Sequence, residues 1–502
     1  MNLAPRLHLA LGFFSLVPAG LGAAPAAEPR LFADDAAIET MSGLTRRVNA
    51  LRKHGTEPVL RPERPWENMA TLPMAVFYDD EEHIFKMWYR PGAEKFHLAY
   101  ATSRDGVTWD RPALHLVTWH GSDDNNLLSL VTGVGYNGIF KDRHESDPAR
   151  RYKYFGYGWK GGKRVGPPGI CVYFSPDGFH WQESPANPAL FGIGDSHSPM
   201  GWDERISRYV AFIKPAIPSP IPGAVKTTGN FWTQGIRIIN RSTSEDMMHW
   251  SPMETVLAPD EDDPPNTHFY GISVFPDRGL YFGLLWVYHP NALMIDVQLA
   301  LSRDSIHWQR AGRRHPILSY GLPNQFDSHV VIALKPILVG DRYLVYYLAE
   351  DAAHGLVSAR ETYPVLTVEP RMQKIANFEY NDWTLKRRGF VGLAEFPRDR
   401  LVSVDADEGR GELVTKPFAL TGRQVRVNAN AEGGEVRVEI LDAGGQPIPG
   451  YGGGEAQAAS GDSANHLAAW KGGSDLSALQ GKEVKLRIIA RHARLYSFKI
   501  EP

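Results

Sequence analysis

Two short stretches of this sequence place a carboxylate two residues before a histidine. They are 195–197 and 327–329, and both read Asp-Ser-His. In a strand, side chains two residues apart point to the same face, so each stretch presents a carboxylate beside an imidazole. A third acid, Glu67, lies in the stretch Pro-Trp-Glu-Asn. Carboxylates that converge on one pocket can act as proton donor and as nucleophile or base, so Glu67, Asp195 and Asp327 are our candidates for catalysis.

The elements that must position these acids are marked by a repeated motif. Ser-x-Asp-x-x-x-Trp begins at residues 103, 175, 244 and 302, with β-type residues between the copies. A repeat of this length is typical of a radial array of small sheets. Strand-like runs flank each copy, so we expect a hairpin turn in which Asp accepts backbone N–H groups and Trp packs against the next sheet. We therefore interpret the motif Asp residues as structural.

A second repeat consists of an apolar run, an acidic turn and an aromatic strand. Its turns contain Asp79, Asp142, Asp203, Asp277 and Asp341. Five copies predict a five-bladed β-propeller in which the run before each turn is the innermost strand. The fifth copy lacks the Trp motif, and residues 30–65 are expected to supply a strand that closes the ring.

The C-terminal part of the chain differs from the repeats. Runs such as 435–441 and 483–489 alternate polar and apolar residues between Gly-rich turns, which predicts an antiparallel β-sandwich. The predicted fold class is all-β. The predicted organisation is a signal peptide over 1–27, an N-terminal extension over 28–65, a propeller over 66–373, a connector over 374–394 and a sandwich over 395–502.

The N-terminus and the composition limit where and with what the protein works. Arg6 precedes an apolar stretch over 7–22 and small residues over 23–27, the pattern of an export signal. We therefore expect a secreted or periplasmic protein. Cys171 is the sole cysteine, which excludes an internal disulfide, and its apolar strand predicts burial. The net charge of −3 and the lack of a basic run argue against nucleic acid as a partner. No membrane span is expected, and we predict a monomer.

These repeats and the appended sandwich resemble the five-bladed propeller glycoside hydrolases of families 43, 32 and 68. The resemblance covers about residues 60–370, and the Asn-Asp-Pro-Asn signature of invertases is absent. It implies that three carboxylates enter the funnel from the innermost strands, one as acid and one as nucleophile or base. Carried to this chain, these are Glu67, Asp195 and Asp327. The families place a Glu in the third blade, where this sequence has Asp195.

Further polar and aromatic residues at the starts of the inner strands, or at the end of the fifth aromatic strand, are predicted to bind substrate. They are Trp66, Asn137, His197, His268, Tyr270, His329, Asp351 and His354. No metal-binding motif is present and no cofactor is expected, although the histidines are also compatible with a divalent cation in the funnel.

Two functions follow as hypotheses. The first is a secreted glycoside hydrolase that cleaves a poly- or oligosaccharide with its funnel carboxylates. The alternative is a propeller that binds glycan without cleaving it. A sialidase is a weaker reading, because sialidase repeats are one residue longer and their propellers have six blades. The sugar, the linkage, the stereochemical outcome and the roles of the individual carboxylates stay open.

Overall fold

The β-type repeats of the sequence fold into antiparallel sheets. The computed structural model describes residues 28–92, 97–129, 133–162, 167–191, 196–217, 236–264, 267–289, 292–354 and 388–502. Within these ranges there is no α-helix, and only short 3-10 turns interrupt the strands. The prediction of an all-β fold is confirmed. None of the helical turns in this part of the chain has the length and apolar character needed to cross a membrane.

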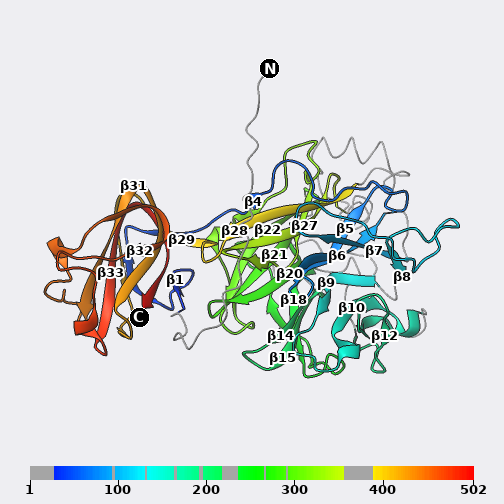
Figure 1. Ribbon diagram of the computed structural model, residues 1–502, viewed down its shortest axis with the longest axis horizontal. Helices are drawn as coiled ribbons and strands as arrows, with labels where there is room; N and C mark the ends of the chain where they lie inside the picture. Colours follow the sequence, from blue (N-terminus) through cyan, green and yellow to red (C-terminus); the bar gives the residue numbers. More distant parts are fainter. Residues whose placement is uncertain are drawn as a thin grey trace, which may run out of the picture.

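Five antiparallel units follow one another along the chain (Figure 1). The first unit contains β5 (Thr71–Asp79), β6 (Ile84–Pro91), β7 (His97–Ser103) and β8 (Leu127–Ser129). The second contains β9 (Gly133–Lys141), β10 (Tyr152–Gly158), β11 (Gly169–Ser175), β12 (Gln182–Glu183) and β13 (Leu190–Phe191). The third contains β14 (His197–Asp203), β15 (Arg208–Ile213), β18 (Ile239–Ser244) and β19 (Glu254–Leu257), with the small pair β16 (Ala216–Ile217) and β17 (Ile236–Arg237) beside it.

The fourth and fifth units share one hydrogen-bonded sheet. The fourth contains β20 (His268–Asp277), β21 (Leu280–His289), β22 (Met294–Ser302), β23 (Trp308–Arg310) and β24 (Pro316–Leu318). The fifth contains β25 (Val330–Ala333), β26 (Ile337–Val339), β27 (Arg342–Glu350), β28 (Gly389–Pro397) and β4 (Arg52–Lys53). One parallel residue pair, Ile295 with Val330, joins the two units. The predicted closing strand from residues 30–65 is therefore β4, which pairs with β28.

The acidic turns of the second repeat fasten neighbouring units to each other. In four of these turns, the Asp accepts a hydrogen bond from a tyrosine on the second strand of the next unit. The pairs are Tyr152–Asp79 (3.3 Å), Tyr209–Asp142 (2.6 Å), Tyr281–Asp203 (2.5 Å) and Tyr343–Asp277 (2.9 Å). Burial, together with the bond to Asp203, raises the pKa of Tyr281 to about 12, so this hydroxyl stays a donor at neutral pH.

The seam between the last and first units is built differently. Phe85 stands where the other units have the tyrosine, so no such bond is made to Asp341. Instead the Tyr346 hydroxyl of the last unit donates to the Gly106 carbonyl of the first at 2.7 Å. Its ring also packs edge-on against Trp109, with centroids 5.6 Å apart. The ring of contacts thus runs from each unit to the next and from the last to the first.

The Ser-x-Asp-x-x-x-Trp motifs form the predicted hairpin turns. In the first copy, Asp105 Oδ1 accepts the backbone N–H groups of Val107 and Thr108 at 2.8 and 2.7 Å, and Gly106 has φ +76°. The other copies repeat these bonds with Asp177, Asp246 and Asp304. The structural interpretation of the motif Asp residues is confirmed.

The C-terminal body has its own hydrophobic core and one hydrogen-bonded sheet of eight strands. Its strands are β1 (Arg30–Leu31), β2 (Ile38–Ser42), β3 (Thr45–Val48), β29 (Val402–Thr415), β30 (Phe418–Ala419), β31 (Gln424–Asp442), β32 (Ala459–Leu467) and β33 (Glu483–Glu501). The register of β31 and β33 shifts between Asn430 and Glu435, and such bulges bend long strands over a core. This body lies beside the repeat units and shares the N-terminal segment with them (Figure 1).

Two predicted boundaries fall inside or beside strands. β28 spans the predicted junction at 394/395 and pairs with β27 along its length. The predicted N-terminal extension divides between both bodies, because β1 to β3 join the C-terminal sheet and β4 joins the last repeat unit. The predicted signal peptide lies outside the described residues, as does the connector up to residue 387.

Candidate functional site

Glu67, the first predicted acid, is fully buried and engaged at both oxygens. Oε1 accepts from the Tyr89 hydroxyl at 2.6 Å and from Arg111 Nε at 2.7 Å. Oε2 accepts the backbone N–H groups of Glu63 and Arg64 at 2.7 and 2.9 Å. This carboxylate therefore holds its own loop and a buried guanidinium in place, and its predicted role as an acid stays a prediction.

Asp327, the second predicted acid, is also buried and paired. Its Oδ2 accepts from Lys53 Nζ at 2.6 Å and from the Tyr347 hydroxyl at 3.0 Å. Among the described residues, no hydrogen bond or ion pair joins Asp327 to Glu67. Asp195 lies outside the described residues, two positions before the first residue of β14. Because Asp195 lies outside the described residues, the meeting of the three acids in one funnel stays a prediction.

Three of the predicted substrate-binding residues do meet, near the starts of the inner strands. With their neighbours they form a group that we call the His268 cluster: Lys214, Arg237, His268, Tyr270, Tyr288 and His354. The His354 ring packs edge-on against Tyr270, with centroids 4.9 Å apart. Lys214 Nζ lies 4.2 Å from the centroid of the Tyr270 ring. β17, β20, β21 and the segments that follow β15 and β27 therefore converge on one aromatic and cationic surface.

The charge state of His268 follows from its surroundings. Burial, reinforced by the nearby charges of Arg237 and Lys214, holds the pKa of His268 well below its usual range. Arg237 Nη1 lies 3.0 Å from Nδ1 of this ring. Because a guanidinium only donates, Nδ1 accepts and the ring proton resides on Nε2. His268 is thus a neutral imidazole that carries its proton on Nε2.

A carboxylate that the sequence analysis did not select lies next to this cluster. Glu350, the last residue of β27, is 1% exposed and lies 3.8 Å from His354 Nδ1. It lines a cavity of about 390 Å³ together with Arg90 and the backbone at Gly92 and Gly389. Of the residues that line this cavity, Glu350 is the single acid. The cavity lies at the strand-start end of the ring, since Ala70 and Leu72 at the start of β5 also line it.

The remaining predicted residues fall into two groups. His329 lies beside Glu350, because its backbone N–H donates to the Glu350 carbonyl at 3.1 Å. His197 is buried, with its ring against Gly135, where any side chain would collide. Asp351 forms an ion pair with Arg388 at 2.6 Å, and Trp66 donates to Asn126 at 2.8 Å, so both are held on the protein itself.

Asn137 has a different position from the one predicted. Its amide donates to the hydroxyls of Ser198 and Ser273 at 2.8 and 2.9 Å, and its carbonyl accepts the Lys335 N–H at 2.7 Å. The four residues belong to four different units. Asn137 therefore ties the inner strands together across the axis of the ring, midway along them.

Sequence reasoning missed Glu350, Lys214 and Arg237. Glu350 ends the fifth aromatic strand and directly precedes the predicted residue Asp351, so the same end-of-strand position could have indicated it. Lys214 and Arg237 carried no motif, and only the meeting of β15 and β17 with β20 reveals them. No group of three or more His, Cys, Asp or Glu residues that could hold a metal ion occurs in the described ranges.

Comparisons with known proteins give structural neighbours only. No protein-family model matches the chain, and no curated protein matches it. One similar structure comes from a family of mannoside phosphorylases, GH130, that contains glycoside hydrolases targeting β-1,2-mannosidic linkages in Candida mannan. Its sequence is 14% identical, the TM-score is 0.41, and the match covers 70% of this chain and 95% of that one. A thermostable family-43 glycoside hydrolase matches with 13% identity and a TM-score of 0.39 over 56% of this chain and 84% of its own.

An enzyme of another type is similar to the same degree. An N-acetylgalactosamine deacetylase from F. plautii matches with 12% identity and a TM-score of 0.38 over 75% of this chain and 96% of its own. The chain is thus similar in structure to glycoside hydrolases, as its repeats predicted. At this distance the similarity does not assign a reaction, because one fold hosts many activities.

Proposed function

We propose that the protein is a glycoside hydrolase that cleaves a glycosidic bond of an oligo- or polysaccharide at the strand-start end of a five-bladed propeller. The five-blade count is supported by the chain of contacts from each unit to the next, and by Tyr346, which joins the last unit to Gly106 of the first. The observation that carries the activity is Glu350, a buried carboxylate on a cavity of about 390 Å³ beside the His268 cluster.

The chemistry of these groups suits a sugar. Glycosidic cleavage needs one carboxyl group to protonate the leaving oxygen and a second to act as nucleophile or base. We assign one of these roles to Glu350 and the other to Asp195, which precedes β14. The Tyr270 and Tyr288 rings of the His268 cluster are the aromatic surface that would stack on a pyranose.

A glycan-binding propeller without hydrolytic activity is the second candidate. It is favoured by one observation: Glu67 and Asp327 are each held by a cation, Arg111 and Lys53, and Glu350 is the single acid on the described cavity. In that case Glu350 would accept hydrogen bonds from sugar hydroxyls, and no bond would be cleaved.

The test separates the two. The purified full chain is incubated with a panel of neutral and acidic oligosaccharides, and new reducing ends are measured. We expect turnover on at least one member, and a loss of about 10²–10⁴-fold in Glu350→Gln with an unchanged melting temperature. Glu245→Gln, an exposed residue of the third unit, is the matched control and should retain full activity. Binding of a panel member without cleavage would favour the second candidate.

We also propose that the protein is exported. The support is the basic, apolar and small-residue pattern over residues 1–27. Determination of the N-terminus of the protein recovered from the native cell is the test, and a mature chain that begins near residue 28 is expected. A chain found intact in the cytoplasm would contradict the proposal.

A further inference from the structure

A second cavity lies at the other end of the inner strands, away from the His268 cluster. It has a volume of about 330 Å³ and is formed where β5, β9 and β14 end. Its walls include Tyr78, Phe140 and Trp202, and Lys335 and Asn137 lie at its inner end. The proposed hydrolase does not use this cavity, because the Asn137 bonds across the ring separate it from the strand-start end.

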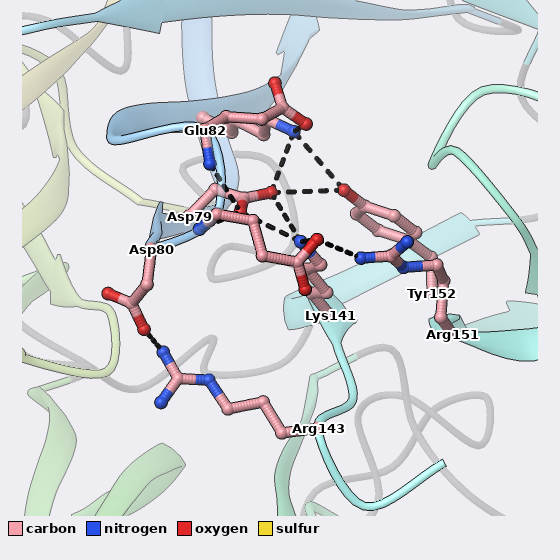
Figure 2. Close-up of polar contacts among 9 residues, drawn as sticks. Asp79, Asp80, Glu82, Lys141, Arg143, Arg151 and Tyr152 are labelled. Atoms are coloured by element: carbon pink, nitrogen blue, oxygen red, sulfur yellow. Dashed lines mark hydrogen bonds and ion pairs between the residues drawn. The ribbon is translucent and has the colours of Figure 1, made fainter. Parts of the chain in front are cut away.

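The acidic residues at the β5 side of this cavity, Asp79, Asp80 and Glu81, are paired with cations (Figure 2). Asp79 accepts from Lys86 and Lys141, both at 2.9 Å. Although burial opposes it, these two ammonium groups lower the pKa of Asp79 far below its usual range. Glu81 pairs with Lys141 and with Arg151. Asp80 pairs with Arg143, as Figure 2 shows. The charges of these carboxylates are therefore compensated by protein cations, and they require no cation from solution.

Lys335 is the exception among the cations that line the cavity. Its Nζ donates to the Met200 carbonyl at 3.1 Å, and it forms no ion pair with any described residue. Lys141 and Arg143, the other lining cations, both have carboxylate partners. An ammonium has three N–H donors, and the Met200 carbonyl accepts from one of them, so the hydration that half-buried Lys335 has lost is replaced only in part. Desolvation accordingly lowers the pKa of Lys335.

An aromatic stack also lines this cavity. The rings of Trp202 and His144 are stacked, with centroids 3.5 Å apart and planes inclined by 8°, and both residues line the cavity. Because the two rings cover each other's inner faces, the stack offers one outer ring face, which suits a small ring-shaped body. The volume is sufficient for one monosaccharide-sized molecule.

We propose that this cavity binds a small monocarboxylate of monosaccharide size, with its carboxylate on Lys335 Nζ and its body against Trp202 and His144. A single unmatched positive charge at the inner end corresponds to a single negative charge on the ligand. A phosphate dianion fits less well, because Glu204, which forms no ion pair with a described residue, also lines the cavity. A sugar acid and a non-sugar carboxylic acid share this chemistry.

The experiment measures binding to the full chain by calorimetry, with sodium glucuronate, sodium benzoate, glucose and inorganic phosphate as separate probes. Saturable binding of glucuronate or benzoate is expected, with neither glucose nor phosphate competing. Preference between the two carboxylates identifies a sugar or a non-sugar source. Binding of glucose equal to that of glucuronate, or of phosphate alone, would overturn the proposal.

Two substitutions locate the ligand. Lys335→Met should weaken carboxylate binding at least tenfold, whereas Lys471→Met, an exposed lysine of the C-terminal body, should leave it unchanged. Glu204→Gln, which changes an exposed residue and so spares the fold, should tighten binding about twofold at low salt. The proposal is wrong if Lys335→Met binds normally, or if Glu204→Gln has no effect while Glu350→Gln abolishes binding, since the ligand would then lie at the other end.

Discussion

The two ends of the inner strands carry different kinds of residue. At the acidic-turn end the same arrangement recurs from unit to unit, an Asp that accepts from a Tyr of the next unit. At the strand-start end the residues vary more: Thr71 and His268 begin their strands without a shared motif, and the Asp-Ser-His stretch occurs only at 195–197 and 327–329. Repetition in every unit therefore marks the end that assembles the ring, and variation marks the end that is free to acquire chemistry.

The largest effect is expected from a substitution of Asp195. If the strand-start end carries the chemistry, Asp195→Asn should lower turnover by about 10²–10⁴-fold and leave the melting temperature nearly unchanged, because the amide keeps the size of the side chain. Activity on the best panel substrate and a thermal melt are the measurements. A collapse of stability with normal specific activity of the remaining folded protein would make Asp195 a structural residue.

The next largest effect is expected at Glu67, which lies near the strand-start end but has structural contacts. Arg111→Met leaves this buried carboxylate without its cation and should reduce the free energy of unfolding by about 3–5 kcal/mol. Urea denaturation is the measurement. A small loss of stability together with a large loss of turnover would instead support the predicted role of Glu67 in catalysis.

Loss of a tyrosine hydroxyl at the contacts between units should lower the free energy of unfolding by an amount that depends on the group to which it donates. Tyr209→Phe removes a 2.6 Å bond to the buried carboxylate of Asp142 and should cost about 1.5–3 kcal/mol. Tyr346→Phe at the closing seam removes a bond to a neutral carbonyl and should cost about 0.5–1.5 kcal/mol. Denaturant unfolding of the pair checks the order. The reverse order would mean that the closing seam, not the Tyr–Asp seams, limits the stability of the ring.

The smallest effect is expected for the contribution of the hairpin turns to stability at acidic pH. Burial alone would raise the pKa of Asp177, but hydrogen bonds from the backbone and ring of His180 outweigh it and lower the value to about 2. Because the pKa is lower in the folded chain than in the unfolded one, this turn stabilises the fold above about pH 4 and loses that contribution as the pH falls through 2. Asp177→Asn should therefore flatten the decline of the unfolding free energy between pH 4 and pH 2. An unaltered decline would show that the turn does not contribute.

The framework of the fold could be predicted from the sequence because its determinants are local. Ser103, Asp105 and Gly106 make their bonds within a few residues of each other, so the motif alone identifies the turn. The acidic turns can also be recognised in the sequence, but the tyrosines that donate to them cannot. Asp142 and Tyr209, for example, lie 67 positions apart. The strand that closes the last unit was predicted from residues 30–65, and β4 occupies that place.

The candidate site is harder to predict from the sequence than the fold, because it depends on contacts between distant segments. Asp327 is a candidate because it lies before a strand, and nothing in the sequence indicates that Lys53, 274 residues away, pairs with it. His268, Tyr270 and His354 are predicted to bind substrate and lie together, since the starts of the inner strands gather at one end. The sequence predicts Asp351 and not Glu350, because an isolated strand-like run does not show which of two neighbouring residues faces the site.

The bonds that Asn137 makes to Ser198, Ser273 and Lys335 have a consequence for how a polymer is handled. Under the proposed function, a polysaccharide end that entered from one side would meet these bonds and could not pass out of the opposite side. Each cleavage would then release its product through the opening by which the polymer arrived, which favours repeated dissociation over continuous sliding along one polysaccharide chain.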